Sequence, residues 1–112
     1  MGTCYQGKLA MGKPVTVVGS KTTGHEDWPS TTVNSGCSWV SVNGKPVARI
    51  GDTCDPHTNP PGITHYPVLS QGSSFVRIDG IPVSYEGAEV ADGGCDSSHK
   101  IAQGESFVKI PE

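Results

Sequence analysis

Short apolar stretches separated by polar turns run along most of the 112-residue chain. The clearest are residues 15–18, 39–42 and 75–78, which are rich in β-branched and aromatic side chains. In the last two, apolar and polar positions alternate, which indicates half-buried β-strands. No segment repeats its apolar residues with the period of a helix. The pattern therefore predicts an all-β fold.

A threefold repeat organises these strands. Its pattern, Gly-x-Ser-aromatic-Val-x-(Val or Ile), starts at Gly36, again 36 residues later at Gly72, and again 32 residues later at Gly104. The third copy is cut short by the end of the sequence. Repeats of this length are typical of stacked or pseudo-symmetric folds.

The first two copies continue into a turn, Asn43-Gly44 in one and Asp79-Gly80 in the other. Both pairs are strong indicators of a two-residue β-hairpin turn. A proline follows each turn at the same offset, and because proline cannot donate to a ladder, we expect it at a strand start or an edge. The sequence thus predicts pseudo-repeated β-hairpins with approximate threefold symmetry.

Composition narrows the class of protein. Only 34% of residues are apolar, while 15 Gly and 9 Pro limit long helices. A core this small often needs a metal or a disulfide as a staple. The net charge of −3, without a basic patch, argues against nucleic-acid binding. No signal-peptide core or membrane-length apolar stretch is present, so we expect a cytosolic, reducing site of synthesis, where cysteine serves as a metal ligand or a small packed residue.

Metal-ligand side chains gather in the polar connections, residues 25–34, 53–71 and 87–103. These hold all four histidines and two of the cysteines, and include the pairs Cys54-x-x-His57 and Cys95-x-x-x-His99. Approximate threefold symmetry would bring such loops together at one end of the axis. Three His and one Cys make a sound tetrahedral Zn²⁺ set, and a closed four-ligand site is structural rather than catalytic. Cys37 is expected to be a small packed residue, and Cys4 to be uninvolved.

Residues 43–52, Asn-Gly-Lys-Pro-Val-Ala-Arg-Ile-Gly-Asp, resemble the motif that names the PAAR (proline-alanine-alanine-arginine) proteins. Val47 replaces the first alanine. Residues 18–25 are similar to the family's opening stretch, with Ser20 in place of Asp. The resemblance covers about residues 15–110 and implies a small cone of three pseudo-repeats with zinc near its apex. It also implies a single domain, 1–112, made of an N-terminal extension (1–14) and the repeat cone (15–110).

By position, the resemblance implies metal ligands at His25, His65 and Cys95. The remaining ligand follows the first repeat, where Cys54 and His57 compete; His57 is favoured because it completes a three-His, one-Cys set. His99 is the reserve candidate.

The resemblance further implies a structural protein, not an enzyme, whose wide base binds the end of a trimeric β-helical spike in a type VI secretion system or phage tail. We expect one cap per trimer, transient contact with the target membrane, no nucleic-acid partner and no fused effector domain. The protein would be made in the cytoplasm, assembled at the spike tip and delivered to the target cell. The alternatives are a small zinc-stabilised binding or adhesion module and, with less room for a pocket, a metal-dependent hydrolase.

Overall fold

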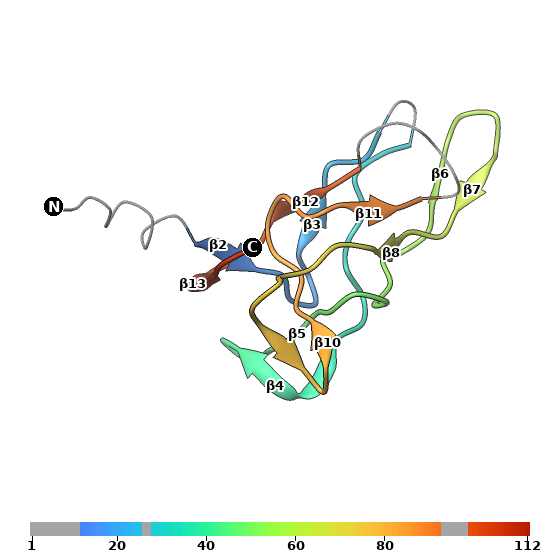
Figure 1. The fold of residues 1–112 in the computed structure, drawn as a ribbon. Coiled ribbons are helices and arrows are strands. Elements are labelled where there is room, and N and C mark those ends of the chain that lie inside the picture. Colours follow the sequence, from blue (N-terminus) through green and yellow to red (C-terminus); the bar gives the residue numbers. More distant parts are fainter. Residues whose placement is uncertain (1–11, 26–27, 93–98) are drawn as a thin grey trace, which may run out of the picture.

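The computed structural model describes residues 12–25, 28–92 and 99–112, and these parts are all-β, as predicted (Figure 1). These described parts contain no helix, and therefore no helix that could span a membrane. The strands are short and pair in twos. They are β2 (Lys13–Val15), β3 (Lys21–Thr22), β4 (Cys37–Val42), β5 (Lys45–Val47), β6 (His57–Thr58), β7 (Thr64–His65), β8 (Val68–Leu69), β9 (Arg77–Ile78), β10 (Ile81–Pro82), β11 (Val90–Ala91), β12 (Ile101–Gln103) and β13 (Glu105–Ile110).

Both predicted hairpins are confirmed. β4 pairs with β5 and β9 pairs with β10, each antiparallel across a two-residue turn. Asn43 and Asp79 have φ values of 55° and 54°, and the glycines after them have 78° and 77°. Two successive positive φ angles define the turn type that matches the twist of a hairpin, which is why Asn-Gly and Asp-Gly occur there.

The third strand pair is formed by the two ends of the described chain, and no turn joins its strands. We call it the third hairpin because it holds the same place as the other two. β13 pairs with β2, so that Lys109 lies opposite Pro14, as Ser41 lies opposite Pro46 in the first hairpin. The register shift before this pair is also the same in both. Residues 12–15 thus complete the copy that looked truncated in the sequence. Lys13 and Pro14 belong to strand β2, whereas residues 1–11 of the expected N-terminal extension lie outside the described residues.

A closed ring of main-chain hydrogen bonds joins the three repeats. The amide of Thr16 donates to the Ser84 carbonyl at 3.1 Å, the amide of Ser84 to the Ala48 carbonyl at 3.0 Å, and the amide of Ala48 to the Thr16 carbonyl at 2.9 Å. These three residues hold the same place in their repeats and are completely buried. A cycle of three equivalent bonds means that the pseudo-threefold axis passes between them.

Two apolar clusters lie along this axis. The first sits beneath the hairpins and consists of Val15, Val17, Val47, Val83, Tyr85, Ala88 and Ile110. The second lies further along and consists of Val33, Ala48, Cys54, Leu69, Val90 and Ile101. Val33, Leu69 and Ile101 each accept a hydrogen bond from a glycine amide, Gly19, Gly51 or Gly87, at 2.8–2.9 Å. The core therefore repeats three times around the axis, and each repeat contributes one large side chain to it.

The two ends of the cone differ in structure. The strand pairs β2/β13, β4/β5 and β9/β10 lie at one end, which we call the base, and β6 and β7 lie toward the other, which we call the narrow end (Figure 1). Between them, β3 pairs with β12 and β8 pairs with β11, which ties the three connecting segments to one another. This arrangement carries the polar loops to one place.

Candidate metal centre

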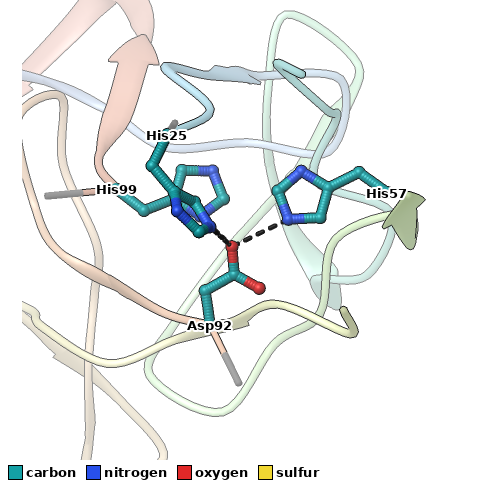
Figure 2. A group of neighbouring side chains, drawn as sticks. All are labelled: His25, His57, Asp92 and His99. Carbon is teal, nitrogen blue, oxygen red and sulfur yellow. Dashed lines mark hydrogen bonds and ion pairs between the residues drawn. The ribbon is translucent and has the colours of Figure 1, made fainter. Parts of the chain in front are cut away.

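Four buried side chains from the connecting segments converge at the narrow end: His25, His57, His99 and Asp92. One ligand-type atom of each lies within 4.8 Å of those of the others (Figure 2). His25 follows β3, His57 begins β6, Asp92 follows β11 and His99 precedes β12. Because each strand is fixed to another segment by its ladder, the threefold arrangement places these residues together although they lie up to 74 residues apart in the sequence.

Asp92 lies at the centre of this cluster. Its Oδ2 atom lies 2.7 Å from His57 Nε2 and 2.9 Å from His99 Nδ1, and it is hydrogen-bonded to His25 Nε2. Burial by itself would raise the pKa of the Asp92 carboxyl. The hydrogen bonds from His57 and His25, and the charges of His57 and His99, outweigh burial and lower this pKa below its usual value. The carboxylate is therefore ionised near neutral pH.

His57 has oxygen acceptors at both ring nitrogens. Nδ1 lies 2.7 Å from the Pro29 carbonyl oxygen, which can only accept a hydrogen bond. With Nδ1 donating to this carbonyl, Nε2 is the ring nitrogen that points at Asp92 Oδ2 in the centre of the cluster. A metal ligand has this same arrangement, with one ring nitrogen held by a backbone carbonyl and the other free for the metal.

Other buried nitrogen atoms of the cluster have no hydrogen-bond partner among the described residues. They are His25 Nδ1 and His99 Nε2, whereas His99 Nδ1 has only its contact with Asp92 Oδ2. Burial lowers the pKa of His99, while the nearby Asp92 opposes that change, and the net direction is downward. Neutral imidazole is the form that binds metals. The donor set of three imidazoles and one carboxylate, buried and partly unsatisfied, therefore fits a divalent metal ion such as zinc.

His65 lies against the cluster through a different contact. Its Nδ1 atom is 3.3 Å from Asp92 Oδ1, and β7 places it directly opposite His57 on β6. The indole ring of Trp28 stacks on His65 at a centroid distance of 4.1 Å and on His25 at 5.2 Å. Its Nε1–H also donates to the Ile63 carbonyl at 3.0 Å. Trp28 thus fixes the ring planes of both histidines and joins two connecting segments.

The structure brings together three of the four predicted ligands and the reserve candidate. His25, His57 and His65 all contact Asp92, and so does His99, which lies in the central group. Cys95 lies outside the described residues, as does Cys4. His57 and His65 were expected in loops, but they form the two-residue ladder β6/β7, which is too short to produce an alternating pattern.

The other candidate cysteines are packed into the interior. Cys37 is buried, as expected for a small packed residue. Cys54 lies in the second apolar cluster, where burial, with the negative charges of Asp55 and Asp92, raises its thiol pKa to about 12. A thiol held in its protonated form is a poor metal ligand. Of the two competitors after the first repeat, His57 is the one at the cluster.

Asp92 is the residue of this site that the sequence analysis missed. Nothing in its local sequence distinguishes it from the aspartates at turns. Its position three residues before Cys95, in the same connecting segment as His99, is the one feature that could have pointed to it.

Together, the ring-closed repeats and the buried imidazole cluster define a class of small all-β cones that have a site suited to a metal at the narrow end. The PAAR motif family matches residues 3–55 and, in a second overlapping stretch, residues 23–96. The chain belongs to this family. Its members are structural proteins of spike tips in type VI secretion or phage-like particles, and in general they bind spike proteins. No curated protein matches the chain.

Proposed function

We propose that this protein caps the blunt end of a trimeric β-helical spike in a contractile injection apparatus, where it forms a sharp tip that helps to pierce the target envelope. The observation that carries the proposal is the closed ring of equivalent hydrogen bonds through Thr16, Ala48 and Ser84. A ring of this kind gives a single chain approximate threefold symmetry. One monomer can therefore face all three chains of a trimer at once.

The base offers what such a contact needs. Each of its three strand pairs has a proline at the matching position, opposite Ser41, Arg77 or Lys109. The end of a β-helical trimer leaves strand edges unpaired, and unpaired edges invite aggregation. A cap that covers them at one per trimer both protects the spike and narrows its end.

The narrow end would be held by zinc. We propose His25 and His57 as two of the ligands, because the sequence predicts both and both belong to the buried group. For the other two positions, the candidates are His65 or His99, and Cys95 or Asp92. Few residues surround the apex, and a structural zinc site can contribute on the order of 10 kcal/mol to folding. In this proposal the metal supplies rigidity where the apolar core ends, as a point that pierces an envelope requires.

The test is stoichiometry. The purified protein is mixed with the trimeric spike protein encoded in the same genome, and the mass of the complex is measured by light scattering. One cap per trimer supports the proposal. Three caps per trimer, or no complex with any spike of that genome, contradicts it.

A further inference from the structure

Three large aromatic side chains stand exposed on the hairpins of the base. Trp39 on β4, Phe75 just before β9, and Phe107 on β13 are 67%, 76% and 75% exposed. We call these three residues the aromatic triad. They include both phenylalanines of the chain and one of its two tryptophans. Phenylalanine has no polar group that water could satisfy, so this exposure does not stabilise the monomer.

The triad is threefold in structure as well as in sequence. Each aromatic residue lies two positions before the residue that pairs with the proline of its hairpin: Ser41 opposite Pro46, Arg77 opposite Pro82, and Lys109 opposite Pro14. The three side chains therefore occupy equivalent places around the axis. The three hairpins share this placement although their other outward residues differ.

The position after each aromatic faces the interior in at least two of the copies. Val40 and Val76 are partly buried and pack against the apolar cluster beneath the base. The aromatic residues thus project away from the core that their neighbours contact. A serine precedes each of them, Ser38, Ser74 and Ser106, and all three serines are exposed. Each exposed ring accordingly stands beside a small polar residue, as an interface anchor beside a polar rim does.

We propose that the aromatic triad anchors the base to its partner, with one ring entering an equivalent apolar recess on each chain of a trimer. The inference rests on the proposed function and goes further, because it names the anchors and the chemistry of the recess. A threefold partner offers three identical recesses, and the triad offers three aromatic side chains at equivalent positions. Buried aromatic anchors dominate interface energetics, and their polar surroundings contribute little.

Binding to a threefold-symmetric partner predicts how substitutions in the triad affect affinity. Since its three recesses are identical, loss of any one ring removes one of three similar contacts. Phe75 and Phe107 carry the same ring, so Phe75→Ser and Phe107→Ser should weaken binding to a similar extent, about 30-fold for a typical hot-spot residue, and Trp39→Ser by at least as much. A patch that does not follow the threefold symmetry would give unequal effects at the two phenylalanines.

The experiment measures binding of the full chain to its cognate spike trimer by calorimetry, for the parent, the three single variants and the triple variant. Tyr66→Ser is the matched control, because Tyr66 is a 72% exposed aromatic residue outside the base hairpins. Thermal midpoint and metal content are measured for every variant. Since the triad residues are exposed, both should stay at the parental value.

The outcomes separate the two proposals. The triad is supported as the anchor if the parent binds, the two phenylalanine variants weaken binding comparably and the triple variant abolishes it. Tyr66→Ser should leave binding unchanged. Parental binding that the triple variant retains overturns the triad but leaves the cap. No parental binding to the trimer overturns the cap itself. If the parent instead self-associates or binds phosphatidylcholine vesicles, and the triple variant does neither, the occupant is a second copy or a lipid surface, and the assignment to a trimer is wrong.

Discussion

Closure of the ring by the two ends of the described chain can be tested at Gly104. A Cβ atom added at this position would lie 2.7 Å from the Pro14 carbonyl oxygen and 2.8 Å from that of Val15. Both atoms belong to the backbone of β2 and cannot rotate away. At the equivalent Gly36 and Gly72, an added Cβ atom would lie 2.9 Å from the carbonyl oxygen of Val47 or of Pro82. The glycine that opens each repeat is thus required by a close approach of the partner strand.

The expected cost of Gly104→Ala follows from these contacts. Forcing a methyl group into a packed site typically costs about 1–3 kcal/mol. Alanine also restricts the unfolded chain, which offsets about 0.4–1 kcal/mol of that cost. The net loss of stability should be roughly 1–2 kcal/mol. At about 5 °C per kcal/mol for a domain of this size, the thermal midpoint should fall by about 5–10 °C.

Calorimetric unfolding of the metal-loaded protein would measure this change, with Ser106→Ala as the control. Ser106 is an exposed residue of the same strand, so its substitution should alter stability by less than about 0.5 kcal/mol. If Gly104→Ala unfolds at the temperature of the parent, residue 104 does not pack against β2. The third hairpin, and the closed ring that depends on it, would then be wrong.

Two further predictions concern the narrow end. Protein purified without an affinity tag should carry about one zinc per chain. His57→Ala should lower metal content and thermal midpoint together, whereas Cys4→Ser should lower neither. A His99→Ala variant that keeps its zinc would exclude His99 as a ligand. In the metal-free protein, burial lowers the pKa of His99 from 6.5, so below this value the unfolded state binds the proton more readily than the folded state. The free energy of unfolding in urea should therefore fall between about pH 7.5 and about pH 5.5, and the lowered pKa of Asp92 extends the loss to more acid pH; a rise in stability on acidification would contradict this reasoning.

The sequence by itself determined the repeat and its local geometry. Asn43-Gly44 and Asp79-Gly80 encode their turns directly, because few other pairs adopt two successive positive φ angles. The confinement of histidine to the segments between hairpins also predicted that imidazoles gather at the narrow end. These features can be recognised in the sequence because each depends on residues a few positions apart.

Only the tertiary structure decided how the repeats close and which side chains meet. Residues 12–15 complete the third hairpin, but nothing local in the sequence pairs them with residues near position 110. Asp92 joins the histidines because β11 is fixed to β8, and β12 to β3, not because of its neighbours in the sequence. Pairing between distant segments depends on the closure of the whole ring. That closure is a property of three repeats together, whereas the turns and strands are properties of each repeat alone.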